Sequence, residues 1–183
     1  MSNEAGASNP PAVKYRFAHL ALATVVGMLA AVLVYCTYHV RGLRDPNPSD
    51  FDSLWRSSRL VLSGRDPYAL IGPGKAIPFP WPIQYPAWTF VALTPFALLS
   101  LELARLLFAA LTTGCLTYAI FKTRPHLWPM LLSFGFLFAI RRGQWSPLLF
   151  AGFLWAPLSI FLPLKPSLGL ACFLAKPRWR VSK

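Results

Sequence analysis

The chain has 183 residues, of which 55% are hydrophobic and only 13% are charged, and its mean hydropathy is +0.47. This composition excludes a disordered chain, which needs low hydrophobicity, and three cysteines are too few to hold a chain of this length as a disulfide scaffold. The net charge is +12, but the basic residues lie between or beside apolar runs, which is typical of charges that orient membrane helices; we therefore expect a membrane protein without a nucleic-acid partner.

The first apolar run predicts a membrane-spanning helix. Residues 1–16 are mostly small or polar and predict a disordered cytoplasmic tail. Residues 17–40 then form an apolar run of 24 residues, which as a helix extends about 36 Å and can cross a bilayer. A cleaved signal peptide is the alternative, but the run is too long and no small-x-small cleavage site follows it. Because Lys14 and Arg16 precede the run, we expect a signal anchor with the tail inside and residue 41 onward outside.

Residues 41–85 predict an external loop, which is far longer than a connection requires. This loop holds four of the six carboxylates of the chain: Asp45, Asp50, Asp52 and Asp66. Apolar residues at helical spacing predict an interfacial helix over residues 49–63, with Arg56, Arg59 and Asp52 off the apolar face. Ser49 followed by Asp52 is a capping-box pattern. A turn is predicted at residues 66–68 and an extended, proline-rich loop at residues 72–82.

The remaining apolar segments predict shorter helices over residues 88–99, 103–121, 127–140, 147–162 and 167–175, with a loop at 122–126 and a basic break at 141–144. Together these segments predict an all-α integral membrane protein with five or six transmembrane or partly spanning helices in one domain, residues 17–175, followed by a basic tail, residues 176–183. Two basic pairs, Lys122 with Arg124 and Arg141 with Arg142, flank one short helix and compete for the inner face, so the topology after the first helix stays open.

The sequence supports neither a metal site nor a reactive cysteine. His19, His39 and His126 lie on separate segments without a carboxylate or cysteine at ligand spacing, so we expect no metal site and no cofactor. Cys36, Cys115 and Cys172 lie within apolar runs, where a free cysteine is usually a small hydrophobic residue.

Charged residues at the breaks between apolar segments are the strongest candidates for chemistry. A carboxylate such as Asp50, at a membrane surface, can act as general base on a hydroxyl acceptor. Arg141, Arg142 and Lys165 at the same level can hold the phosphate of a lipid. This combination is the minimum needed to move a sugar from a lipid-phosphate carrier.

Four segments resemble bacterial polytopic glycosyltransferases of the GT-C class, in particular the polyprenyl-phosphate-mannose-dependent α-mannosyltransferase-like family: DFDSLWRSSRLVLSGRDPYAL (50–70), QYPAWTFVALTPFALLSLELARLLFA (84–109), RRGQWSPLLFAGFLW (141–155) and LPLKPSLGL (162–170). The resemblance implies sugar transfer from a polyprenyl-phosphate donor by a multi-pass protein of the inner membrane. It implies Asp50 as the base, a Gly-x-x-Pro-Tyr turn ending at Tyr68, and donor contacts from Lys165, Arg142 and Gln144. Members of the family are longer, so the chain is expected to correspond to their N-terminal half, with a possible partner chain supplying the missing helices.

Simpler interpretations stay open for each of these residues. Asp50 can be a first-turn carboxylate that favours the helix dipole, Asp52 a cap, and the Arg141–Arg142 pair an orientation signal. For the whole chain, the alternative is a non-catalytic small membrane protein or fragment that binds lipid or partner helices. A transporter piece ranks last, because Glu102, the carboxylate within a later apolar segment, can pair with Arg105 three residues on.

Overall fold

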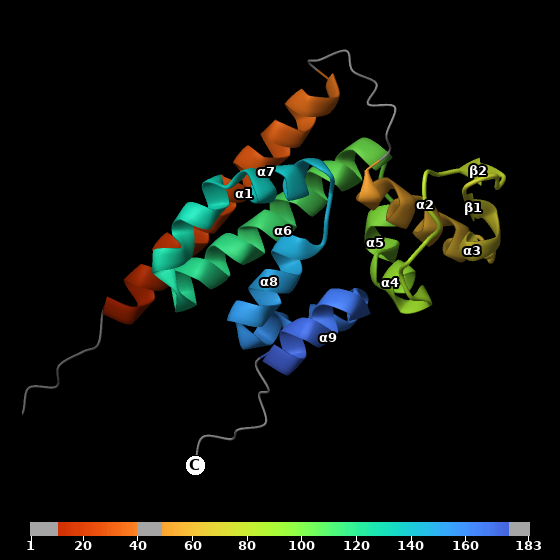
Figure 1. Cartoon of the computed structure of the whole chain (residues 1–183). Coiled ribbons are helices and arrows are strands. Elements are labelled where there is room, and N and C mark those ends of the chain that lie inside the picture. The colour runs from red at the N-terminus through yellow and green to blue at the C-terminus, as the bar shows by residue number, and fades with distance from the viewer. Residues whose placement is uncertain (1–10, 40–48, 176–183) are drawn as a thin grey trace, which may run out of the picture.

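A computed structural model describes residues 11–39 and 49–175 of the chain, and this part is mostly helical (Figure 1). The helical class is therefore confirmed. The strictly all-α expectation needs one amendment, because β1 (Ile71–Gly72) and β2 (Ile77–Pro78) pair in parallel within the loop predicted as extended.

Two long helices, α1 (Pro11–His39) and α6 (Leu101–Thr123), pack against each other in antiparallel directions (Figure 1). The ring of His19 lies 6.3 Å from that of Phe121 at one end, and His39 lies 3.5 Å from Glu102 at the other. Between them, Gly27 allows close approach, because a Cβ there would lie 2.6 Å from the carbonyl oxygen of Ala110. By length and composition, residues Tyr15–His39 and Leu101–Thr123 are the two segments of the described chain that could cross a membrane.

The predicted end of α1 is confirmed within one residue, but the prediction of disorder over residues 11–16 is wrong, because these residues are helical. The helix begins at Pro11, six residues before the predicted start at residue 17, and it ends at His39, one residue before the predicted end. Proline is favoured in the first turn, since its missing N–H would be unpaired there in any case. The rest of the predicted tail, residues 1–10, and the basic tail, residues 176–183, lie outside the described residues.

The predicted helix of the external loop is α2 (Asp50–Leu62), and the predicted capping box is present at Ser49 and Asp52. The predicted turn is a short helix, α3 (Pro67–Leu70), capped by the Asp66 side chain. One part of the prediction is wrong. Asp52, expected off the buried face, is only 2% exposed, because α2 packs against α4, α5 and α6 and is covered on more than one side.

Prolines divide several segments that the sequence analysis predicted as single helices. Residues 88–99 form α4 (Ala87–Ala92) and α5 (Thr94–Ala97), with Pro95 at the start of α5. Residues 125–141 form a 3₁₀ helix, η1 (Pro125–Leu132), followed by α7 (Phe134–Arg141). Residues 146–164 form α8 (Ser146–Leu154) and a second 3₁₀ helix, η2 (Ala156–Leu164), before α9 (Pro166–Ala175). A proline inside a helix removes one backbone donor and disfavours the α-helix, and the segments that contain Pro129 and Pro163 are 3₁₀ helices.

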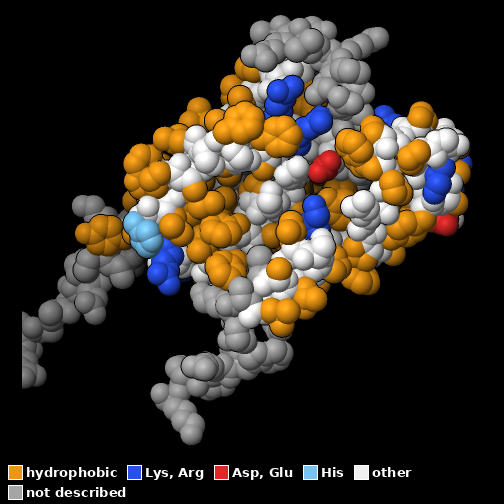
Figure 2. Space-filling view, in the orientation of Figure 1, with side chains coloured by type: hydrophobic (Ala, Val, Ile, Leu, Met, Phe, Trp, Pro, Cys, Tyr) orange, Lys and Arg blue, Asp and Glu red, His pale blue; other side chains and the backbone are white. Residues whose placement is uncertain are grey.

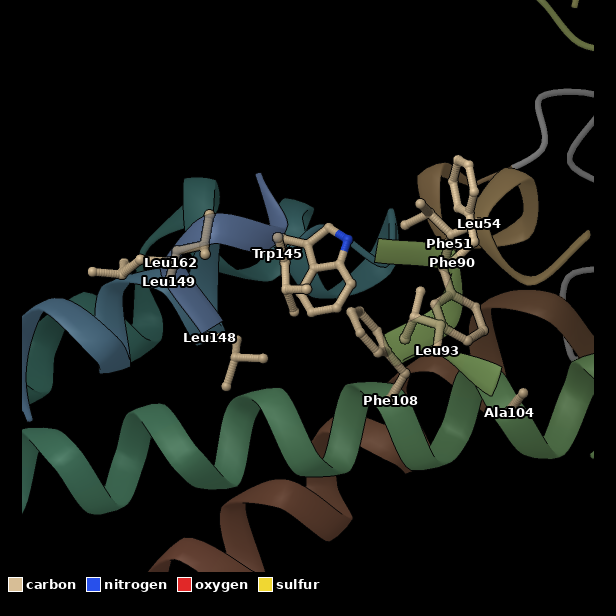
Figure 3. Close-up of a cluster of buried hydrophobic side chains, with 11 residues drawn as sticks. Phe51, Leu54, Phe90, Leu93, Ala104, Phe108, Trp145, Leu148, Leu149 and Leu162 are labelled. Atoms are coloured by element: carbon tan, nitrogen blue, oxygen red, sulfur yellow. The ribbon is translucent and has the colours of Figure 1, made fainter. Parts of the chain in front are cut away.

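A cluster of buried side chains joins α2 and α4 to the long helix α6 and to α8 (Figure 3). Phe51 on α2 stacks on Phe108 of α6 with ring centroids 4.5 Å apart. The ring of Trp145 meets the Phe108 ring edge-on, with their centroids 5.1 Å apart. Phe90 on α4 and Leu93 at its end belong to the same cluster. This packing brings the beginning of α2 to the turn between α7 and α8.

Candidate functional site

The turn between α7 and α8 lies directly on the first turn of α2. The backbone N–H of Asp50 donates to the carbonyl oxygen of Arg142 at 3.0 Å. The next residue, Gly143, has φ of +60°, and a Cβ on it would lie 2.6 Å from the Cβ of Phe51. Glycine is required here for both its backbone conformation and its small size. The basic break that the sequence predicted therefore serves to bring Arg142 and Gln144 beside Asp50.

A second turn, between η2 and α9, places Lys165 on the same site. The hydroxyl of Thr89 donates to the carbonyl oxygen of Leu164 at 2.7 Å, and the indole N–H of Trp88 donates to that of Pro163 at 3.1 Å. These bonds hold the end of η2 against α4. The Lys165 ammonium lies 5.4 Å from the centre of the Tyr85 ring, a cation–π distance.

Asp50 and Lys165 line one cavity of about 330 Å³. Its other walls come from the next turn of α2, from the proline-rich loop and from the start of α9, and they include Ser53, Phe79, Trp81, Gln84, Tyr85 and Ser167. Acidic and basic side chains lie close together on the face of the molecule shown in Figure 2, between α2 and the helices beside it. The cavity therefore combines aromatic walls with a carboxylate and an ammonium group.

Burial raises the pKa of the Asp50 carboxyl group above its ordinary value. The positive charges of Lys165 and Arg142 and a side-chain hydrogen bond from Gln144 oppose this shift, but burial outweighs them. A carboxylate whose pKa is raised binds a proton more readily than an exposed one, so it is a better general base. Burial, together with the nearby Asp50 charge, also raises the pKa of the Tyr85 hydroxyl far above its ordinary value, so this hydroxyl stays protonated.

The structure brings four of the predicted site residues together: Asp50, Arg142, Gln144 and Lys165. The fifth, Tyr68, lies outside the cavity wall. Its hydroxyl donates to the carbonyl oxygen of Tyr85 at 2.6 Å, and its ring lies 5.6 Å from that of Phe90. Tyr68 thus supports the loop that carries Tyr85.

A buried ion pair next to the site was missed by the sequence analysis. The guanidinium group of Arg105 on α6 donates to both carboxylate oxygens of Asp52, Nε to Oδ1 at 2.7 Å and an Nη to Oδ2 at 2.6 Å. Arg105 also lies over the ring of Tyr38 on α1, 4.3 Å from its centroid. The predicted ion pair between Arg105 and Glu102 is replaced by this one, since Glu102 lies 3.5 Å from His39 instead. The Asp52–Arg105 pair ties the first turn of α2 to both long helices.

Several lining residues also escaped the sequence analysis. Ser53 had a usable signal, because a residue three positions after Asp50 shares its helix face. Trp81 and Ser167 had none, since an aromatic residue in a proline-rich loop and a serine near a helix start are both common outside binding sites. Among the residues whose side chains the structure describes, no three histidine, cysteine or carboxylate side chains gather as metal ligands.

Comparisons with protein-family models, curated proteins and solved structures returned no match. The candidate site is therefore defined by its own geometry: the half-buried Asp50 carboxylate lies near two cations and an amide, and with Lys165 it lines a cavity that has aromatic walls.

Proposed function

We propose that this chain takes part in transferring a sugar, mannose or a related hexose, from a polyprenyl-phosphate donor to a hydroxyl acceptor. The proposal includes the GT-C-like resemblance and a multi-pass position in the cell inner membrane, with the site on the outer face. The observation that carries it is the convergence of Arg142 and Gln144, from the α7–α8 turn, and Lys165, from the η2–α9 turn, on Asp50, which lines a cavity together with Lys165.

Each group has one role in this reaction. Asp50 accepts the proton of the acceptor hydroxyl. At the same time the oxygen of that hydroxyl forms a bond to the sugar C1, and the bond from C1 to the donor phosphate oxygen breaks. Lys165 and Arg142 stabilise the negative charge on the departing lipid phosphate. Gln144 orients the Asp50 carboxylate through its hydrogen bond. Inversion at C1 follows from the resemblance, and Tyr68 acts through the loop that carries Tyr85.

Basic residues lie at both ends of the α1–α6 pair. At the end where α1 begins and α6 ends, Lys122 lies over the rings of Tyr118 and Trp155, and Arg16 lines one cavity with these two residues. Arg142 and Lys165 lie at the other end, beside the carboxylates of α2. Because both ends carry cations, the proposed orientation rests on Lys14 and Arg16, which precede the first apolar run and favour that end as cytoplasmic and the Asp50 end as external.

The short helices support a partner chain. α7, α8 and α9 have 8, 9 and 10 residues, whereas a membrane-spanning helix needs about 20. Leu170 and Leu174 on α9 are 59% and 66% exposed, so this helix has apolar surface that further helices would cover. The proposed partners are thus membrane lipid, the lipid-linked sugar donor and helices from a second chain.

The test is transfer of radiolabelled sugar from a polyprenyl-phosphate donor by the full chain in proteoliposomes. Asp50→Asn should lower the initial rate by about a hundredfold or more, the usual contribution of a general base. Asp66→Asn is the matched control, because it removes an exposed carboxylate of the same loop and keeps a capping side chain, and it should leave the rate unchanged. Full activity of Asp50→Asn would remove the base assignment.

A second candidate, a non-catalytic membrane protein, is supported by the exposed apolar surface of α1. Phe17, Met28 and Leu29 are 68%, 63% and 62% exposed, as on a helix that contacts lipid or other helices. This candidate predicts no transfer by the wild-type chain with any lipid-linked donor. Transfer above the rate of empty proteoliposomes would exclude it.

A further inference from the structure

A second cavity, of about 470 Å³, lies between α1 and α6 near their cytoplasmic end as proposed above. Leu20, Thr24 and Met28 on α1 face Leu111 and Tyr118 on α6 across it, and Trp155, after α8, closes one side. It shares no lining residue with the Asp50 cavity. Its walls are almost entirely apolar, so the groove suits a hydrocarbon chain.

The groove forms because the two helices touch through small residues. A Cβ on Gly27 would lie 2.6 Å from the Ala110 carbonyl oxygen, and one on Gly114 would lie 3.2 Å from the Ala23 carbonyl oxygen. Small residues bring the backbones close at this contact, and the larger side chains beside it stand apart as walls. The groove therefore follows from the packing of α1 on α6.

One end of the groove is positively charged. Arg16 lines it, and the Lys122 ammonium lies 4.5 Å from the centre of the Trp155 ring and 5.4 Å from that of Tyr118. Within the part of the chain that the structure describes, neither Arg16 nor Lys122 forms an ion pair with a carboxylate. Basic and histidine side chains are visible at the end of the helix pair where α6 ends (Figure 2). Cations at one end and apolar walls along the rest of the groove favour a ligand with an anionic head and an apolar tail.

We propose that this groove binds one anionic phospholipid. An acyl chain lies beside Leu20, Met28 and Leu111, and the headgroup phosphate lies between Arg16 and Lys122. Tyr118 and Trp155 lie at the level of the headgroup, where amphipathic rings are favoured. A zwitterionic lipid fills the same groove with less affinity, because its headgroup carries no net negative charge for the two cations to attract.

The test uses the purified full chain in detergent, titrated with phosphatidylglycerol or phosphatidylcholine and observed by native mass spectrometry. Phosphatidylglycerol should be retained in preference. The double variant Arg16→Gln/Lys122→Gln should weaken its binding by about tenfold or more while leaving phosphatidylcholine binding unchanged. Arg65→Gln, which removes an exposed cation from the external loop, is the control for charge and should change neither.

A second pair of variants tests the groove itself. Thr24→Phe fills the groove from α1 and should reduce retention of both lipids. Val25→Phe is the control, because it adds the same ring at a neighbouring exposed position that does not line the groove, and this variant should bind both lipids as the wild type does. Equal retention of the two lipids by the wild type, or wild-type binding by Thr24→Phe, overturns the proposal. Displacement of the lipid by free inorganic phosphate at matched concentration also overturns it. Asp50→Asn should bind lipid normally, so failure of sugar transfer does not affect this inference.

Discussion

The ion pair between Asp52 and Arg105 should be the most sensitive single contact near the candidate site. The Asp52 side chain is 3% exposed, and both of its oxygens accept hydrogen bonds from Arg105, at 2.7 and 2.6 Å. Arg105→Met keeps much of the aliphatic stem of the side chain and removes its charge. The variant therefore leaves a buried carboxylate without its cation while changing packing little.

The expected loss in the free energy of unfolding is about 3 kcal/mol, at the lower end of the 3–5 kcal/mol typical for removing one partner of a buried pair. Two observations favour the lower end. Ser49 still donates to Asp52 through its backbone N–H at 2.9 Å and its hydroxyl at 2.7 Å. The Arg105 side chain is 18% exposed, so water can reach part of the space it leaves.

The assay is equilibrium unfolding of the purified full chain in mild detergent, followed by tryptophan fluorescence. Glu102→Gln is the matched control, because its ion pair with His39 is exposed and should contribute less than about 1 kcal/mol. Asp52→Asn combined with Arg105→Met should cost less than the sum of the single variants, since the two groups interact directly. If Arg105→Met costs no more than Glu102→Gln, the reasoning from burial is wrong.

Two further predictions concern the site. Gly143→Ala should destabilise the chain by about 2–4 kcal/mol in the same assay, from its φ of +60° and the clash with Phe51, whereas Gly135→Ala, with open space around it, should be neutral or stabilising. The transfer rate should rise with pH as Asp50 ionises, and Lys165→Met should move this rise to higher pH, since the ammonium lowers the pKa of Asp50. Because folding raises the pKa of Asp50 above its ordinary value of 3.8, the contribution of this group to stability should fall as pH rises through the two pKa values, and Asp50→Asn should remove that contribution. An unchanged pH dependence of the transfer rate in Lys165→Met would contradict the role of Lys165. An unchanged pH dependence of stability in Asp50→Asn would contradict the raised pKa of Asp50.

Local signals predicted much of the helical structure. The bounds of α6, Leu101–Thr123, lie within two residues of the predicted helix at each end, and Ser49 caps α2 with Asp52 as expected. Capping and apolar runs act over one or two turns, so they are readable in the sequence. The single helix predicted over residues 127–140 was wrong, although Pro129 and the cap residue Ser133 mark the break between η1 and α7.

The candidate site was predictable in its residue types but not in its assembly. Sequence motifs identified Asp50, Arg142, Gln144 and Lys165 as candidates, yet only the packing of the α7–α8 and η2–α9 turns around α2 brings them to one carboxylate. Likewise, only the tertiary structure shows that Arg105 pairs with Asp52.

From sequence, the obvious partner of Arg105 is Glu102, which is near it on the same helix. In the folded chain the packing of α2 on α6 buries Asp52 and brings it to Arg105, while Glu102 stays exposed, where an ion pair contributes little. The sequence by itself determined where helices form, because that depends on neighbours along the chain. The tertiary structure decided which charges are buried together, because the strength of a charge pair depends on the surroundings that distant segments supply.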